Sequence, residues 1–288
     1  MKTKFQVAVC RLQVDLRHQS VGPTFNQQPA TGNSRCAFTL VELLVVISIL
    51  GLLAALSVPA IKNIGAGNTT AGAARQLLDD VGRARQLAIS QRTTVYMVFV
   101  PTNFWGSLTG TNLYSSASTN LVDKQLTGYN FISYGKVGDQ PGRHTWHYLA
   151  DWQSLPQGSF IAAQKFAANY TITDPVTSVA YNIKRFNLTN TIPFPTEGAP
   201  APVGMPYIAF NYLGQLTFDG LNVATRDEYI PLAQGTVSYG YNPTTKTPQL
   251  TTVTSANITE TPSSTSISYN IIDIEPLTGR ATWKHHKM

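Results

Sequence analysis

The chain has 288 residues, a formal net charge of +6 and a pI near 9.3, values at which nucleic-acid binding has to be considered. Much of this charge lies in the first 37 residues, which hold Lys2, Lys4, Arg11, Arg17 and Arg35 against Asp15 alone. The other residues therefore carry a net charge of only +2, which excludes the basic footprint of a nucleic-acid-binding domain. Both cysteines, Cys10 and Cys36, also lie in this first segment, so we expect no disulfide in the rest of the chain.

The most informative stretch is residues 37–61, AFTLVELLVVISILGLLAALSVPAI, in which Glu42 is the one charged residue. A helix rises about 1.5 Å per residue, so residues 38–61 are enough to cross a hydrocarbon core of roughly 30 Å. The sequence predicts a transmembrane helix here. The basic residues before it predict a cytoplasmic N-terminus and an exported C-terminal part.

A carboxylate inside an apolar helix is costly, so Glu42 should have a partner or a task. One explanation is local. Thr39 and Glu42 have the S/T-x-x-E spacing of a capping box, in which the acidic side chain reaches back to the start of the helix. The other explanation is a partner on another chain, and the two roles are compatible.

Arg35, a small residue and the block FTLVELL at 38–44 together resemble the class III signal of type IV pilins and type II secretion pseudopilins. The resemblance implies that a prepilin peptidase cuts between Ala37 and Phe38 and methylates the new amine of Phe38. Glu42 then becomes the fifth residue, which in this family pairs with the amine of a neighbouring subunit. The family usually has glycine before the cut, where this chain has Ala37.

The resemblance also implies a leader at 1–37, a transmembrane and assembly helix at 38–61, and partners that include other pilin subunits and the bacterial inner membrane. A secreted substrate or parts of the secretion machinery are further expected partners. The apolar residues from Leu43 and Leu44 to Leu56 would pack the filament. Pro59 and the glycines after it predict a bend or a loosened helix at 57–70, which either serves filament packing or simply ends the membrane helix.

A second, amphipathic helical pattern follows, and we expect helix at 62–92 to continue into the globular domain. Apolar residues recur at spacings of three and four, which is typical of a helix that lies on a sheet. They are Ala74, Leu77, Leu78, Val81, Ala84 and Ala88.

Residues 93–288 predict an antiparallel β domain with a loop-rich insertion at 102–200 that carries specificity. Strands are expected at 93–100, 128–134, 144–149, 179–186, 207–212, 215–218, 226–230, 235–241, 266–274 and 281–284. We expect loops at 192–206, which is rich in proline, and at 243–265, which is rich in threonine.

Three segments resemble the H-type minor pseudopilins and their FimT-like pilus counterparts: residues 73–99, the Leu213–Gly214 hairpin and the TGR turn at 278–280. The implied fold class is α+β and pilin-like, with a long N-terminal helix packed on a C-terminal antiparallel sheet. The implied function is a minor subunit of a type II secretion pseudopilus or a related pilus. The alternative is a membrane-tethered extracytoplasmic binding domain that does not polymerise.

No catalytic motif is present, since G-x-S-x-G, the P-loop and G-x-G-x-x-G are all missing. His144 and His147 are spaced as H-x-x-H, but a strand would put them on opposite faces, and no neighbouring Cys or carboxylate completes a ligand set. We therefore expect no enzyme activity, no cofactor, no metal and no nucleic-acid partner.

Overall fold

The computed structural model describes residues 39–102, 104–108, 115–140, 142, 144–173, 178–238, 257–260 and 270–285, without the side chains of 56–68, 257–260 and 285. It confirms an α+β chain with an N-terminal helix followed by antiparallel sheets. The chain divides into two compact units, Met1–Leu53 and Ala54–Met288.

Helix α1 (Leu40–Gln91) passes without interruption through residues 57–70, where the sequence predicted a bend or a loosened helix. A proline within a helix removes one backbone hydrogen bond, and here the turns on either side remain helical. The helix ends in a Schellman motif. Arg92 takes a left-handed φ of 52°, Arg92 N donates to Ile89 O and Thr93 N donates to Ala88 O.

The first sheet, sheet A, is built around β1 (Val95–Phe99), which pairs with β2 (Gly128–Tyr134) and β10 (Tyr207–Phe210). Its order is β11-β10-β1-β2-β3, all antiparallel, with β4 also paired to β2. The other strands are β11 (Leu216–Thr217), β3 (Trp146–Tyr148) and β4 (Gln153–Ser154). Five of the expected strands, at 93–100, 128–134, 144–149, 207–212 and 215–218, are confirmed in this sheet.

The second sheet, sheet B, is built around β12 (Glu228–Ser238), which pairs with β14, β13 and β5 along its length. The strands predicted at 226–230 and 235–241 are joined into one strand within the described residues. The reason is that residues 231–234, between the two predictions, are also paired, first with β14 and then with β5. The partners are β5 (Ser159–Ile161), β13 (Asn257–Glu260), β14 (Asn270–Ile274) and β15 (Ala281–His285). Strand β13 lies within the segment predicted as a threonine-rich loop.

Two small hairpins complete the strands: β6 (Tyr170–Thr173) with β7 (Ala180–Ile183), and β8 (Thr191–Pro193) with β9 (Pro202–Gly204). The proline-rich segment 192–206 is thus partly a hairpin and not only a loop. The short helices are η1 (Phe104–Ser107), α2 (Ser116–Thr119), η3 (Val122–Lys124) and α3 (Gln164–Ala167). Residues 102–200 are not a separate insertion, since β2, β3, β4 and β5 come from this range and belong to the two main sheets.

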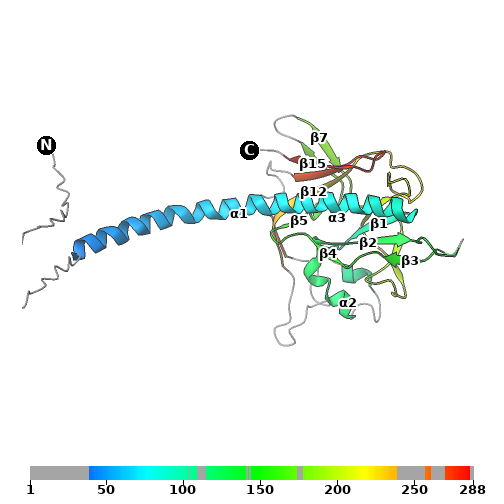
Figure 1. Cartoon of the computed structure of the whole chain (residues 1–288), viewed down its shortest axis with the longest axis horizontal. Coiled ribbons are helices and arrows are strands. Elements are labelled where there is room, and N and C mark those ends of the chain that lie inside the picture. Colours follow the sequence, from blue (N-terminus) through cyan, green and yellow to red (C-terminus); the bar gives the residue numbers. More distant parts are fainter. Residues whose placement is uncertain are drawn as a thin grey trace, which may run out of the picture. The chain divides into compact units, whose positions relative to one another are not determined.

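The main core lies between α1 and the two sheets. In Figure 1, the part of α1 that belongs to the unit Ala54–Met288 runs alongside β1 and β2. The predicted apolar face of the helix is confirmed: Leu78 is partly buried, and the fully buried members are Ala74, Leu77, Val81, Ala84 and Ala88, joined by Ala73. Four of these six are alanines, which allow the helix axis to come close to the strands. Strands of both sheets contribute apolar side chains to the same cluster.

The other face of sheet A is covered by a second apolar cluster. Consequently β1 is buried on both faces, with Met97 in the first cluster and Val98 in the second. The covering side chains come from the range predicted to be loop-rich: Phe104, Trp105, Leu108, Leu121, Val122, Ile192 and Phe194. This coverage explains why that range holds many single aromatic and aliphatic residues.

Two turns that the sequence singled out meet at the C-terminal part of α1. Gly279 has a φ of 62°, and a Cβ atom there would lie 2.1 Å from the Gly214 carbonyl oxygen. A Cβ atom at Gly214 would lie 2.7 Å from Cδ1 of Ile89. Arg85 Nε donates to the Thr278 carbonyl at 2.7 Å and fixes the same turn to the helix. Both glycines are therefore required by close approach as well as by backbone conformation.

A buried ion pair joins α3 to β12. Lys165 Nζ donates to Glu228 Oε1 and to the Lys184 carbonyl, and the Lys165 and Glu228 side chains are 0% and 4% exposed. Burial lowers the pKa of the Lys165 amine and raises the pKa of the Glu228 carboxyl, while their mutual attraction opposes both shifts. Each charge thus depends on the other for its stability in the core.

We predict that Lys165→Met or Glu228→Leu alone lowers the free energy of unfolding by about 3–5 kcal/mol, because each leaves one uncompensated buried charge. The double variant should recover most of the loss, since both charges are then absent. Urea unfolding followed by circular dichroism measures these changes, with the exposed Lys136→Met as control. Single variants as stable as the wild type would contradict the prediction.

The negative charge of Asp273, on β14 of sheet B, has few stabilising contacts among the described residues. Asp273 Oδ1 is buried and has no hydrogen-bond partner among the described residues, and Lys284 Nζ lies 3.7 Å from the other oxygen. Burial first, and then the charge of Asp227, raise the pKa of Asp273 above its ordinary value. Protonation of Asp273 therefore favours the folded state, and its ionised form costs stability near neutral pH.

Asp273→Asn should accordingly raise the melting temperature at pH 7. Its effect should shrink as the pH falls through the raised pKa, and disappear below about pH 4, the ordinary range of an aspartate, where Asp273 is neutral in both states. Thermal unfolding between pH 3 and pH 8 tests this, with the exposed Asp151→Asn as control. A variant that is less stable than the wild type at pH 7 would show that the carboxylate is stabilising.

Candidate functional site

The amino end of α1 is closed by a capping box between Thr39 and Glu42. Glu42 Oε2 accepts hydrogen bonds from Thr39 N at 3.0 Å and from Thr39 Oγ1 at 2.8 Å, and Glu42 N donates to Thr39 Oγ1 at 3.3 Å. The local role of Glu42 that the sequence predicted is therefore confirmed. The hydrogen bonds of the cap use the Oε2 atom of Glu42. The Oε1 atom takes no part in the cap and can accept a hydrogen bond from another group.

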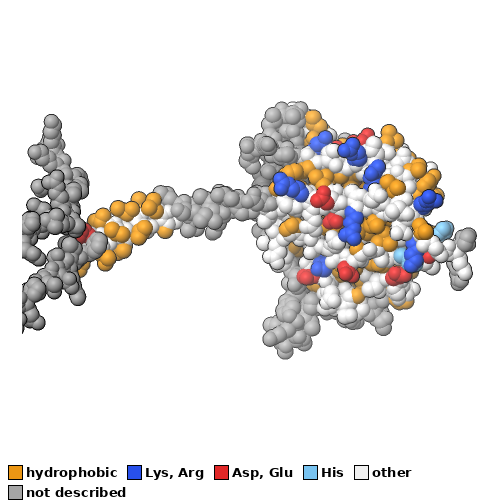
Figure 2. Space-filling view, in the orientation of Figure 1, with side chains coloured by type: hydrophobic (Ala, Val, Ile, Leu, Met, Phe, Trp, Pro, Cys, Tyr) orange, Lys and Arg blue, Asp and Glu red, His pale blue; other side chains and the backbone are white. Residues whose placement is uncertain are grey.

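The described side chains that follow the cap are apolar and exposed on all sides of the helix. Leu43 is 58% exposed and Leu44 is 55% exposed, and every other residue from 40 to 55 is exposed as well. Figure 2 shows these hydrophobic side chains around the first part of α1. The one hydroxyl in this run, Ser48 Oγ, donates to the Val45 carbonyl at 2.8 Å and needs no outside partner. A helix that is apolar all round requires cover from lipid or from other protein surfaces.

Within the residues that the structure describes, no helical stretch has the length and apolarity needed to cross a membrane. The span predicted at 38–61 extends beyond the described side chains at both ends. Ala37 and Phe38, the predicted processing residues, lie outside the described residues. Pro59 lies within α1, but its side chain is not among those described.

The structure gives His147 two carboxylate neighbours that its sequence surroundings did not reveal. Its Nε2 atom lies 3.2 Å from Asp139 Oδ2 and its Nδ1 atom 3.2 Å from Glu197 Oε1. His144 instead packs its ring against Tyr134. The H-x-x-H pair thus shares no ligand set, and no three His, Cys, Asp or Glu side chains of the described chain are arranged to hold a metal ion. His147, on strand β3, thus links the β2–β3 loop, which holds Asp139, to the β8–β9 loop, which holds Glu197.

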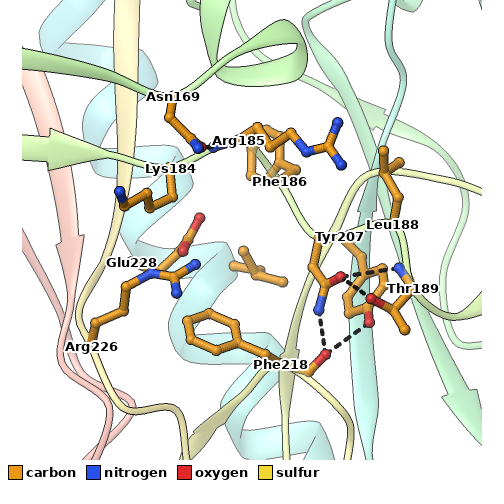
Figure 3. A pocket seen from close by; sticks show the side chains of 12 residues that line it. Asn169, Lys184, Arg185, Phe186, Leu188, Thr189, Tyr207, Phe218, Arg226 and Glu228 are labelled. Carbon is orange, nitrogen blue, oxygen red and sulfur yellow. Dashed lines mark hydrogen bonds between the residues drawn. The ribbon is translucent and has the colours of Figure 1, made fainter.

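A pocket of about 710 Å³, which no sequence motif predicted, lies beside the Lys165–Glu228 pair (Figure 3). We call it the basic pocket. Its wall comes from the segment after β7, the start of β10, the end of the β11 hairpin and the start of β12. The lining residues are Asn169, Lys184, Arg185, Phe186, Asn187, Leu188, Thr189, Tyr207, Ile208, Phe218, Arg226 and Glu228. One local pattern could have indicated this site: the run Lys184-Arg185-Phe186, which combines two cations with an aromatic ring.

Comparison with known proteins bears on the amino end of the chain. Residues 32–58 match the family described as the prokaryotic N-terminal methylation motif, a range that includes Ala37, Phe38, Glu42, Leu43 and Leu44. No curated protein and no solved structure matches the chain. The motif supports a type IV pilin-like protein that is processed and methylated at its amino terminus.

Proposed function

We propose that the chain is a minor pilin or pseudopilin subunit, cut between Ala37 and Phe38, methylated on Phe38 and assembled through α1 into a filament. The filament is a type II secretion pseudopilus or a type IV pilus-like structure. The observation that carries this proposal is the exposed apolar start of α1, which directly follows a methylation motif and holds one carboxylate. Prepilin peptidase and other pilin subunits are its proposed partners.

Before assembly, α1 would anchor the subunit in the inner membrane, with its amino terminus in the cytoplasm and residues 62–288 outside. In the filament, the same apolar side chains would pack against helices of other subunits. Because lipid and a bundle of apolar helices are both dry surroundings, transfer between them need not expose the apolar side chains to water. Among the described side chains at 40–55, Glu42 is the one that needs a new polar interaction.

Glu42 is suited to fix the register between subunits. Its Oε2 atom closes the cap of its own helix, while Oε1 can accept a hydrogen bond from the methylated amine of Phe38 on a neighbour. Opposite charges attract much more strongly in a low dielectric than in water. A carboxylate in the apolar wall of the filament would therefore favour one axial position over the others.

The H-type assignment is supported by the way its three segments come together. The helix of residues 73–91, the Gly214 turn and the Gly279 turn make direct contact, so they form one structural unit. The resemblance therefore covers interacting parts of the domain, which is the reason we favour a minor subunit. Contacts with a secreted substrate or with secretion machinery are proposed for the loops of the β domain.

The second candidate is a membrane-tethered binding domain that does not polymerise, and the basic pocket favours it. Such a protein would use α1 only as an anchor. It would need neither the free amine of Phe38 nor a charged residue at position 42.

Processing is tested by co-expression with a prepilin peptidase, followed by intact mass and N-terminal sequencing. We expect a chain that begins with N-methylated Phe38. Ala37→Gly should be processed at least as well, because glycine is the usual family residue there, and Ala37→Phe should block the cut. A chain that keeps residues 1–37 would favour the tethered domain.

The two roles of Glu42 can be separated with a matched pair of variants. Glu42→Gln keeps the hydrogen bonds of a capping box, since glutamine is accepted at this position, but removes the charge. Thr39→Ala removes the two hydrogen bonds of the Thr39 hydroxyl from the cap and keeps the charge. If Glu42 fixes the register, Glu42→Gln should be lost from sheared filaments while Thr39→Ala is retained, as measured by immunoblot. The reverse result would make the cap the essential function.

A further inference from the structure

We propose that the basic pocket binds an acidic peptide segment of another protein. The inference concerns the β domain and does not rest on filament assembly. Of the charged residues that line the pocket, three are cations, Lys184, Arg185 and Arg226, and one is a carboxylate, Glu228. Lys165 lies beside the pocket and pairs with Glu228, and Asp219 and Asp227 adjoin lining residues in the chain. Glu228 is already paired with Lys165, so three cations remain for a ligand.

None of these three cations has an ion-pair partner in the described part of the chain. Arg185 and Arg226 are exposed, and Lys184 is half-buried. Arg226 lies over the Phe218 ring, 4.4 Å from its centroid, and raises the positive potential at the Lys165–Glu228 pair. Cations collected around a hollow attract anions and hold them more strongly than cations scattered on a flat surface.

The segment after β7 that carries Lys184 and Arg185 is fixed in place before any ligand arrives. Arg185 N donates to Asn169 Oδ1 at 2.9 Å, and Lys165 Nζ donates to the Lys184 carbonyl. Asn187 Nδ2 and Tyr207 Oη both donate to the Phe218 carbonyl. Figure 3 shows the labelled Tyr207 and Phe218 across the pocket from Lys184. A wall held on both sides loses little conformational freedom on binding.

The ring faces in the pocket favour a peptide over a single-stranded nucleic acid. One face of Phe186 stacks on Phe99 with centroids 4.6 Å apart, and Lys165 lies 4.6 Å from the Phe186 centroid. The Phe218 ring is covered by Arg226. Binding of single strands relies on free aromatic faces for base stacking, and both phenylalanine rings already have such neighbours.

Apolar side chains also line the pocket and suit the side chains of a peptide. Ile208 is buried, and Leu188 is 37% exposed. A pocket of about 710 Å³ accommodates several residues, so carboxylates can reach the cations while a neighbouring aliphatic side chain contacts an apolar lining residue. The arginines can each hold a carboxylate through two parallel hydrogen bonds.

The test is fluorescence anisotropy of labelled hexaglutamate with the full chain in a nonionic detergent. Arg185→Gln and Arg226→Gln should each weaken binding several-fold, and together by roughly tenfold or more, since each removes a charge-assisted contact. Arg185→Lys keeps the charge but loses the two parallel hydrogen bonds, so it should bind more weakly than the wild type and more tightly than Arg185→Gln. The control is Arg75→Gln, an exposed arginine on α1 outside the pocket, which should bind as the wild type does.

Raising the salt concentration from 50 to 500 mM should weaken binding further, because salt screens exposed charges. Circular dichroism confirms that each variant is folded. No binding of hexaglutamate by the wild type, or equal binding by the Arg185→Gln/Arg226→Gln variant, would overturn the proposal. If an oligothymidylate of twelve nucleotides bound more tightly than hexaglutamate, and through the same two arginines, the proposal would also be overturned, in favour of a nucleic-acid ligand. A chain that fails to be processed at Phe38 but binds hexaglutamate would overturn the filament proposal alone.

Discussion

The β domain depends on the close contact between the small-residue face of α1 and the two sheets. Ala74, Ala84 and Ala88 leave the helix backbone near the strands, so apolar residues of both sheets reach a single cluster against it. Larger side chains at these positions would separate the layers, because packed interiors tolerate little added volume. The helix is therefore the common wall on which two separately hydrogen-bonded sheets meet.

Contacts between turns also fix the two sheets to each other, beside the C-terminal part of α1. The backbone of the Gly279 turn lies against Gly214, and Leu216 N donates to the Pro276 carbonyl at 2.9 Å. The Lys165–Glu228 pair holds α3 to the start of β12 and borders the basic pocket. The interactions that organise the domain thus also shape the surface where a ligand would bind.

Helix α1 contains two kinds of surface along one continuous element. Residues 73–88 bury an alanine-rich face within the domain, whereas the described residues 40–55 expose apolar side chains in every direction. Intrachain packing explains the first segment and cannot explain the second. The amino end of the helix is adapted to surroundings supplied from outside the chain, and its capping box satisfies the helix start without using a partner.

The sequence by itself determined the local features: the methylation motif, the Thr39–Glu42 cap, the buried face of α1 and strands such as 128–134. Each depends on residues close together in the chain, where periodicity and spacing are readable. Tertiary structure alone decided that residues 228–238 form one strand, that strands from 102–200 join both sheets, and that Asp139 and Glu197 meet His147. It also decided the basic pocket, which unites Arg185 with Arg226. These features depend on pairing between distant segments, which no local pattern specifies.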